Sequence, residues 1–527
     1  MRTAGSLLLA CMIICTISST YAQPSIEWQG CYGGSGDEQA FSIQQTCDGG
    51  YVVTGETNSN DGDVSGNHGE SDFWVLKLDS HGDIDGQTCL GGSDFDFAYS
   101  VDQTDDGGYI VAGHSLSDDG DVTGHHGSTE SSDCWITKLN SFGLLEWQRS
   151  LGGSADDKFR SIRQTDDGGY IAAGYTMSND GDISGHHGST GSYDCWIVKM
   201  NSFGEIDWEK SYHEYSDYAF SIEQTTDGGY IVAGYKRAFT SAFLIVKLDS
   251  DGTFEWQFSF GGINDDYACC IKQTDDEGYI IAGASQSEYG SISDWDYRII
   301  KLDLDGLLEW ERSLGGTTID RAQSIDQTVD GGYIVGGYSF SNDGDVSGHH
   351  GRPIFCDYWV VKLNPIGSIE WQLSLGGTDN EMARAIQQTM DGGFIVAGYT
   401  DSNDDDVSGN HGGGDFWVVK LSAYEDIDEI ARIESFSLSA YPNPFNSALT
   451  INATANSQID IFAIDGRKIH TLDVGATGET GETGGRPHTG NHEIIWSPSP
   501  ETPSGVYLIR ARFGKRETVS KRVVYMK

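Results

Sequence analysis

Pairs of aspartates two residues apart recur in this chain, and their spacing could bind a hard cation. The first copy reads Asp61-Gly62-Asp63-Val64-Ser65-Gly66-Asn67-His68-Gly69. Carboxylates at i and i+2, together with backbone carbonyls, suit Ca²⁺. The same residues also form tight turns through side-chain to backbone hydrogen bonds, so a structural turn is the competing interpretation. The five pairs are Asp61 and Asp63, Asp119 and Asp121, Asp180 and Asp182, Asp343 and Asp345, and Asp404 and Asp406.

Histidine pairs follow the aspartates in three of these stretches. They are His125-His126, His186-His187 and His349-His350. Imidazole nitrogens would favour a transition metal over calcium. A calcium ion, a transition metal and a purely structural turn therefore stay open at these loops.

A second set of carboxylates stands just before one predicted strand of each repeat unit. Capping the free N–H groups of a turn is the simpler interpretation. If this strand lines a central channel, seven like charges would instead ring its mouth, and a bound cation would offset their repulsion. The seven are Glu38, Asp96, Asp157, Asp217, Asp266, Asp320 and Glu381.

One part of the chain departs from the repeat and is locally basic. Tyr212-His213-Glu214-Tyr215 replaces the Leu-Gly-Gly of other units, and Lys236-Arg237 replaces an acidic loop. Binding sites favour such loops on rigid scaffolds. The sequence therefore predicts a ligand groove near His213, Lys236 and Arg237.

Catalytic signatures are missing from the sequence. It contains no Gly-x-Ser-x-Gly, no His-Glu-x-x-His and no phosphate-binding loop. Acid pairs are so numerous that no glycosidase-like couple stands out. We therefore expect a binding protein rather than an enzyme, with no cofactor other than the candidate calcium. A polysaccharide hydrolase or lyase is the alternative.

These residues lie in the loops of a repeat whose strands must position them. An Asp-Gly-Gly-Tyr turn, or a near copy, recurs about every 50 to 60 residues. Four short strands per unit, joined by Gly-containing hairpin turns and without helical periodicity, are the content of a propeller blade. The copies are centred on Tyr51, Tyr109, Tyr170, Tyr230, Tyr279, Tyr333 and Phe394.

The ends of the repeat predict how the ring closes. No fourth strand follows Trp417 to Leu421, whereas an orphan copy, Ile26 to Gln29, precedes the first unit. We expect it to become the outer strand of the last blade, because a closed ring leaves no free sheet edge. Residues 23–422 are thus predicted to form an all-β, seven-bladed β-propeller. Its recurring tryptophans are expected in the cores between blades: Trp147, Trp208, Trp256, Trp310 and Trp371.

Strand parity indicates where the candidate residues gather. In an up-and-down blade, alternate connections lie on opposite faces, so the two tight turns share one face. The loop between the second and third strands and the link to the next blade share the other. The aspartate pairs, the seven carboxylates and the basic spot all belong to these long connections.

Composition and the N-terminus indicate export. Residues 1–22 are typical of a secretory signal peptide, with Arg2, an apolar run from Leu7 to Ile17, and Ala22 before Gln23. No other stretch reaches the roughly 18 apolar residues of a membrane span. The chain carries 32 Lys and Arg against 80 Asp and Glu, a balance that argues against nucleic acid as a partner.

Beyond Leu421 the repeat stops. Residues 423–435 are expected to form an acidic linker, and residues 436–527 a small immunoglobulin-like β-sandwich. Three motifs occur there in order: Tyr441-Pro442-Asn443-Pro444-Phe445-Asn446, Asp465-Gly466-Arg467 and Ser504-Gly505-Val506-Tyr507.

With these motifs the segment resembles the C-terminal sorting domain of bacterial type IX secretion cargo, and the related immunoglobulin-like domain of flagellar hook-capping proteins. The resemblance implies contact with the outer-membrane secretion machinery, export, and then release or surface attachment, often with cleavage of the tail. The final residues, Arg522 to Lys527, only approximate the family's basic-aliphatic end.

The propeller units resemble extracellular quinoprotein-like propeller repeats, a likeness that carries no cofactor residue. Together these observations predict an exported cell-surface or extracellular protein that binds or adheres to a glycan or protein. The alternatives are a polysaccharide hydrolase or lyase built on the propeller, and a calcium-dependent structural surface protein.

Overall fold

The computed structural model describes two compact units, residues 23–424 and the C-terminal unit that begins at Glu425. In the first unit it describes residues 23–128, 130–185, 191–212, 216–238, 240–261, 264–286 and 295–423. In the second it describes 438–441, 445, 447–454, 457–463, 467–473, 491–499, 502–513 and 517–527. The predicted signal peptide, nearly all of the predicted linker, and His186, His187 and His213 lie outside these residues.

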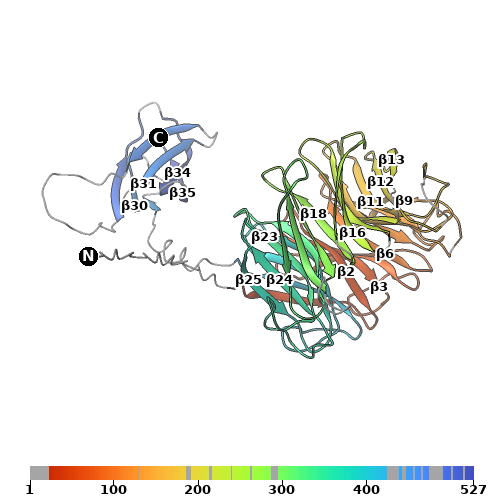
Figure 1. Cartoon of the computed structure of the whole chain (residues 1–527). Helices are drawn as coiled ribbons and strands as arrows, with labels where there is room; N and C mark the ends of the chain where they lie inside the picture. Colours follow the sequence, from red (N-terminus) through yellow and green to blue (C-terminus); the bar gives the residue numbers. More distant parts are fainter. Residues whose placement is uncertain are drawn as a thin grey trace, which may run out of the picture. The chain divides into compact units, whose positions relative to one another are not determined.

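The first unit consists of seven four-stranded antiparallel sheets arranged as propeller blades (Figure 1). Blades one to four are β2 (Glu38–Gln45), β3 (Tyr51–Thr57), β4 (Asp72–Leu78), β5 (Ile84–Leu90); β6 (Asp96–Gln103), β7 (Tyr109–Ser115), β8 (Asp133–Leu139), β9 (Leu145–Leu151); β10 (Asp157–Gln164), β11 (Tyr170–Thr176), β12 (Asp194–Met200), β13 (Ile206–Tyr212); and β14 (Ser216–Gln224), β15 (Tyr230–Arg237), β16 (Ser241–Leu248), β17 (Phe254–Phe260).

Blades five to seven complete the ring. They are β18 (Asp266–Gln273), β19 (Tyr279–Gln286), β20 (Trp295–Leu302), β21 (Leu308–Leu314); β22 (Asp320–Gln327), β23 (Tyr333–Ser339), β24 (Asp357–Leu363), β25 (Ile369–Leu375); and β26 (Glu381–Gln388), β27 (Phe394–Thr400), β28 (Asp415–Leu421) with β1 (Ile26–Tyr32). The first strand of each blade contacts the first strands of both neighbours, and β26 contacts β2. These inner strands therefore surround the axis.

The N-terminal strand closes the ring as predicted. β1 pairs antiparallel with β28, so that Gln29 lies opposite Val419. Trp417 Nε1 donates a hydrogen bond of 2.8 Å to Gln29 Oε1. Glu27 Oε2 lies 3.1 Å from Lys420 Nζ, the ion pair that the fourth strand forms in other blades. The predicted β-propeller and its closing strand are confirmed.

A lysine on the third strand ties each blade together. Its Nζ lies 2.8–3.0 Å from the aspartate of the first tight turn. A carboxylate on the fourth strand approaches the same ammonium, so the lysine charge is compensated from the turn and from the fourth strand. The lysines are Lys77, Lys138, Lys199, Lys247, Lys301, Lys362 and Lys420.

Neighbouring blades are joined at the end of every inner strand by a glutamine that the sequence analysis overlooked. Its side-chain Oε1 accepts a 2.8 Å hydrogen bond from a backbone N–H in the first tight turn of the preceding blade. The repeated Gln-Thr dipeptide was the available signal. The glutamines are Gln45, Gln103, Gln164, Gln224, Gln273, Gln327 and Gln388.

The outer-strand tryptophans pack between blades, as predicted. Trp147 meets the ring of Tyr170 in the next blade at 5.8 Å, and the other four predicted tryptophans make the equivalent contact at 5.7–5.8 Å. Trp28 of the closing strand packs in the same way on Tyr51, at 5.7 Å. A Cβ at Gly82 would lie 2.7 Å from the Trp28 ring, so only glycine fits below it.

The C-terminal unit contains two sheets that share one core. One sheet is β29 (Leu438–Tyr441), β30 (Leu449–Thr454) and β33 (Asn491–Trp496). The other has the order β32 (Lys468–Asp473), β31 (Ser457–Ala463), β34 (Gly505–Phe513), β35 (Glu517–Tyr525). Leu449, Ile461, Trp496, Ile509 and Val523 are buried together. The unit is a β-sandwich, and its immunoglobulin-like classification stays a prediction. In the described part of the chain, no helix has the length and apolarity to cross a bilayer.

Replacing Trp28 tests the closure of the ring. We expect Trp28→Ala to lower the free energy of unfolding by about 2 kcal/mol, because the ring's contact with blade one is lost. Chemical denaturation would measure the change. Phe142→Ala is the control, since this turn residue is 86% exposed and its loss should change stability by less than about 0.5 kcal/mol. Equal effects of the two variants would contradict the role of Trp28.

Candidate functional site

The paired aspartates hold their loops against the link that precedes their own blade. Asp119 accepts a 2.7 Å hydrogen bond from Ser93 N, and Asp121 a 3.4 Å bond from Gly91 N. The same two bonds recur in all five loops. The described carboxylates therefore serve as structural turn residues: Asp61, Asp63, Asp119, Asp121, Asp180, Asp182, Asp343, Asp345, Asp404 and Asp406.

Calcium binding by these loops stays a prediction. Within the described residues, no group of three or more His, Cys, Asp or Glu side chains is placed to hold a metal ion. If the loops bind calcium as extracellular modules do, millimolar calcium should raise the melting temperature and EDTA should reverse the rise. A rise below about 1 °C would contradict the prediction.

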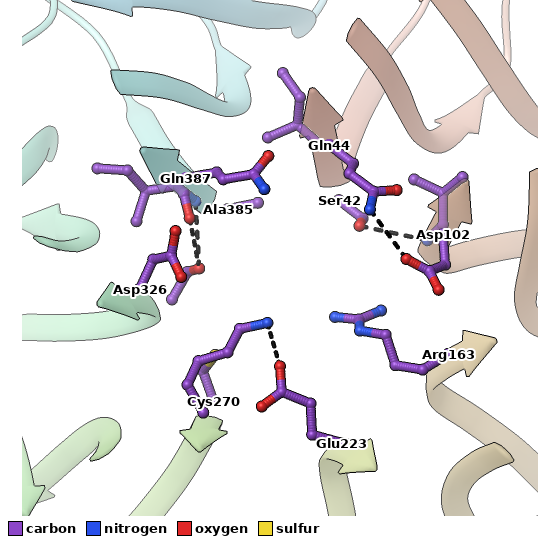
Figure 2. A pocket seen from close by; sticks show the side chains of 14 residues that line it. Ser42, Gln44, Asp102, Arg163, Glu223, Cys270, Asp326, Ala385 and Gln387 are labelled. Carbon is purple, nitrogen blue, oxygen red and sulfur yellow. Dashed lines mark hydrogen bonds and ion pairs between the residues drawn. The ribbon is translucent and has the colours of Figure 1, made fainter. Parts of the chain in front are cut away.

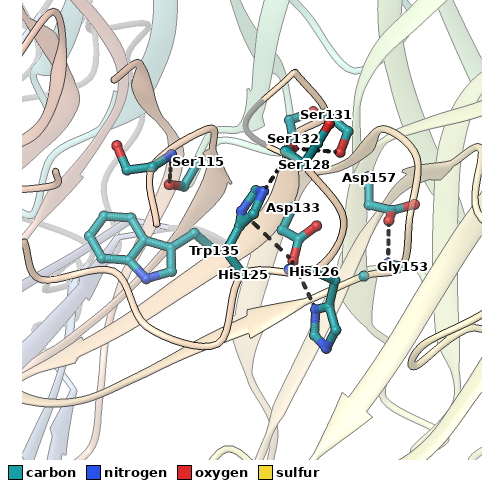
Figure 3. A network of polar contacts seen from close by, with 12 residues as sticks. Ser115, His125, His126, Ser128, Ser131, Ser132, Asp133, Trp135, Gly153 and Asp157 are labelled. Carbon is teal, nitrogen blue, oxygen red and sulfur yellow. Dashed lines mark hydrogen bonds and ion pairs between the residues drawn. The ribbon is translucent and has the colours of Figure 1, made fainter. Parts of the chain in front are cut away.

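Three histidines of the loops link adjacent blades, and Figure 3 shows one of them, His126, beside Asp133 of its own blade. His126 Nδ1 lies 2.8 Å from the buried Asp133, and its Nε2 lies 3.9 Å from Asp182 in the next loop. His350 and His411 bridge two carboxylates in the same way. The hydrogen bond to Asp357 raises the pKa of His350 despite partial burial.

The seven carboxylates before the inner strands are buried caps. Each is at most 3% exposed. Five of them accept a hydrogen bond from the backbone N–H four residues earlier, as Asp157 does from Gly153 at 2.7 Å (Figure 3). The capping interpretation is confirmed for these five. The expectation that the seven ring the channel mouth is wrong, because the blades bury them: Glu38, Asp96, Asp157, Asp217, Asp266, Asp320 and Glu381.

Burial changes the acidity of these caps. It raises the pKa of Asp96 and Glu381 to about 7, and that of Asp157 and Asp320 to about 6. A second buried carboxylate lies nearby, since a Cβ at Gly152 would meet both Asp157 Oδ2 at 2.7 Å and Asp133 Oδ1 at 3.0 Å. The like charge of Asp133 adds to the effect of burial on Asp157.

Stability should therefore fall as the pH rises from 5 to 7.5. A carboxyl whose pKa is near 4 unfolded and higher in the folded state binds more protons when folded, so ionising it destabilises the fold. We expect a loss of more than about 1 kcal/mol in the free energy of unfolding over this range. Asp96→Asn keeps an acceptor for Gly92 N–H and should reduce the slope.

His114 acts in the opposite direction. It is buried, and burial lowers its pKa, so protonation costs stability only toward acid pH. A free energy of unfolding that rises between pH 5 and 7.5, or a slope unchanged by Asp96→Asn, would contradict the assignment of raised carboxyl pKa values.

Two residues of the predicted basic groove, Lys236 and Arg237, lie at the end of β15. Lys236 is opposite Asp217 in the β14–β15 pair, and Arg237 is exposed at the strand end. Their neighbours Tyr218 and Tyr235 stack with ring centroids 4.5 Å apart. His213, the third residue of the prediction, lies outside the described residues. The groove itself stays a prediction.

The structure instead assembles a pocket on the axis that the sequence analysis missed. It has a volume of about 380 Å³ and is lined by one side chain from each blade, three positions after each buried carboxylate. Every inner strand has a β-bulge at that position, where the pairing register shifts. A β-bulge changes the direction in which a side chain points, and bulges are common next to active sites. The lining residues are Phe41, Tyr99, Arg160, Phe220, Cys269, Gln323 and Arg384.

Two arginines in this axial pocket stand apart from carboxylates. Arg160 Cζ lies 3.9 Å above the Tyr99 ring, and one Nη donates a 3.0 Å hydrogen bond to Tyr175. Arg384 contacts Gln323 at 3.4 Å and the sulfur of Met382 at 3.9 Å, and its Cζ lies 5.8 Å from the centre of the Phe41 ring. The Nε atoms of both arginines are buried without a hydrogen-bond partner among the described residues. Neither forms an ion pair with a described carboxylate.

Three positions further along the inner strands, a second ring surrounds a cavity of about 260 Å³ (Figure 2). Its members again come one from each blade: Gln44, Asp102, Arg163, Glu223, Lys272, Asp326 and Gln387. A sequence signal for both rings existed. In each inner strand the positions that fill the blade core repeat closely, whereas the two positions that face the axis vary between units.

The comparisons with known proteins concern the two units separately. Residues 439–483 match the family described as a secretion system C-terminal sorting domain. This segment is the sorting domain of type IX secretion. It marks the chain for export to the cell surface or extracellular space and for contact with that secretion machinery. A search of curated proteins gave no match.

Several solved structures are similar to this chain at low sequence identity. An ulvan lyase, a polysaccharide lyase bound to -[GlcA(1-4)Rha3S]-, is 11% identical over 78% of this chain and 99% of its own, with a TM-score of 0.45. A protein of unknown function from Dyadobacter fermentans is 11% identical over 76% and 99%, with a TM-score of 0.40. The Pan2 WD40 domain of Neurospora crassa is 12% identical over 62% and 89%, with a TM-score of 0.36. At these identities the likeness does not extend to activity.

Proposed function

We propose that this exported protein is a binding module whose propeller holds an acidic glycan, one that carries carboxylate or sulfate groups, in the axial pocket. The observation that supports the proposal is the pair Arg160 and Arg384, whose guanidinium groups face the axis without a carboxylate partner among the described residues. Guanidinium groups recognise carboxylate and sulfate-like oxyanions through paired N–H donors.

The charge balance of the chain bears on these two arginines. Although the chain carries 80 acidic and 32 basic residues, no described carboxylate pairs with either of them. Buried charges are normally paired, because an unpaired buried donor costs free energy. An anionic ligand would supply the missing acceptors.

The other lining residues suit a sugar. Phe41, Tyr99 and Phe220 line the pocket with aromatic rings, and Gln323 adds an amide that can donate and accept. Ligand pockets combine apolar and aromatic walls with a few polar groups that fix orientation. The pocket thus offers stacking surfaces for a sugar ring and two cations for its acidic groups.

Cleavage of the glycan is the second candidate, because Tyr99 lies against Arg160. A lyase uses a base to remove a proton beside a carboxylate that a cation neutralises. Burial raises the pKa of Tyr99, which opposes its action as a base. We therefore favour binding without turnover.

Calorimetric titration with an acidic oligosaccharide, such as tetragalacturonate or a sulfated equivalent, tests the proposal. We expect Arg384→Gln and Arg160→Gln each to weaken binding about tenfold or more, since charged hydrogen bonds contribute roughly 1.5–3 kcal/mol. Arg237→Gln, at the strand end of blade four, is the matched control and should bind like the unchanged protein. Melting curves would show that the variants fold.

Two results would overturn the proposal. One is equal affinity for a neutral oligosaccharide of the same length, which would exclude recognition of the acidic groups. The other is loss of binding in Arg237→Gln with retention in Arg384→Gln, which would move the site to the basic spot. Release of unsaturated products would instead establish the lyase.

A further inference from the structure

In the second ring, beyond the axial pocket, two side chains lack a structural hydrogen bond that the other five form. Gln44, Asp102, Glu223, Asp326 and Gln387 each accept a hydrogen bond of 2.6–3.2 Å from a backbone N–H of the next inner strand. Arginine and lysine have no acceptor atom. Arg163 and Lys272 therefore break a structural pattern that the rest of the ring keeps.

Arg163 has more N–H donors than its hydrogen bonds use. Its Nη1 donates to Ser100 Oγ at 3.0 Å and to the carbonyl of Ile162 at 2.7 Å. It forms no ion pair with a carboxylate among the residues that the structure describes. Figure 2 shows its guanidinium directed toward the open centre of the ring.

The acids of the ring are already engaged. Glu223 pairs with Lys272 at 2.5 Å and accepts the N–H of Gln273. Asp102 accepts from Gln44 Nε2 at 3.1 Å and from the N–H of Gln164. Asp326, the third acid, accepts the N–H of Gln388 at 3.2 Å. Because Lys272 pairs with Glu223, Arg163 is the cation of the ring without a described carboxylate partner.

The shape of the channel limits how a ligand can reach Arg163. Seven inner strands surround the axis, so a chain can approach the second ring only along the axis. The two rings lie three strand residues apart, roughly 10 Å along the strand. The deeper cavity, at about 260 Å³, is smaller than the roughly 300 Å³ at which drug-sized pockets begin.

We infer that the second ring binds the terminal acidic sugar of a uronate chain, so that the protein recognises chain ends and not the middle of a polymer. The terminal carboxylate would meet Arg163, while an earlier acidic sugar lies against Arg160 and Arg384 in the axial pocket. This inference rests on the proposed function, since it assumes that the axial pocket holds an acidic glycan.

Blocking the chain ends tests the inference. Tetragalacturonate with free ends would be titrated beside two forms, each carrying a bulky fluorophore at one end, and beside long polygalacturonate. We expect one of the labelled forms to bind at least tenfold more weakly. The number of proteins bound by the polymer should follow its number of chain ends and not its length.

Variants of the second ring test the recognition of chain ends independently. Arg163→Gln should weaken binding of free tetragalacturonate about tenfold. Gln387→Glu keeps the acceptor for Gln45 N–H but adds a negative charge, and it should also weaken binding. Arg312→Gln is the control, because this arginine likewise donates to the preceding carbonyl, at 2.7 Å, but lies on the outer strand β21. It should bind normally.

The outcomes separate the two proposals. Absence of binding to any acidic oligosaccharide would overturn the proposed function and this inference together. Binding that depends on Arg384, but is equal for free and labelled ends and unchanged in Arg163→Gln and Gln387→Glu, would overturn only the recognition of chain ends. If Arg163→Gln lowers the melting temperature, the Gln387→Glu variant and the end-labelled oligosaccharides test the recognition of chain ends in its place.

Discussion

Everything in the propeller depends on the closure of the ring by β1 on β28. The contacts between the third and fourth strands of an ordinary blade are made in the last blade between residues almost 400 positions apart, as Lys420 and Glu27 show. With that pairing, every blade has two neighbours and no sheet edge is left open. The inner strands are then held at one distance from the axis, which is what gives the channel a defined lining.

The recurring polar residues divide into those that hold blades together and those that face the axis. Lysine and aspartate join strands within a blade, and glutamines such as Gln103 join one blade to the preceding turn. The aspartate pairs and the buried caps hold the long loops to the inter-blade links. Most of the carboxylates that stood out as candidate ligands are thus occupied by backbone N–H groups.

The side chains available for function are those that differ from one repeat unit to the next. The two axial rings contain arginines, aromatic rings, amides and one lysine in an order that no symmetry of the fold requires. A β-bulge in every inner strand turns one of these side chains toward the axis. The scaffold is therefore uniform, whereas the chemistry at its centre is specific to each blade.

The architecture could be predicted from local patterns in the sequence. Turn chemistry, strand alternation and the orphan strand at Ile26 are local patterns, and they predicted the blades, the closure and the inter-blade tryptophans. The tail motifs likewise identified the sorting domain. Which acids accept backbone N–H groups depends on the tertiary structure, because the donors to Asp119 and Asp121 lie 26 and 30 residues away. It also decided which side chains reach the axis, because a bulge changes the facing of one residue without a signature in the local pattern.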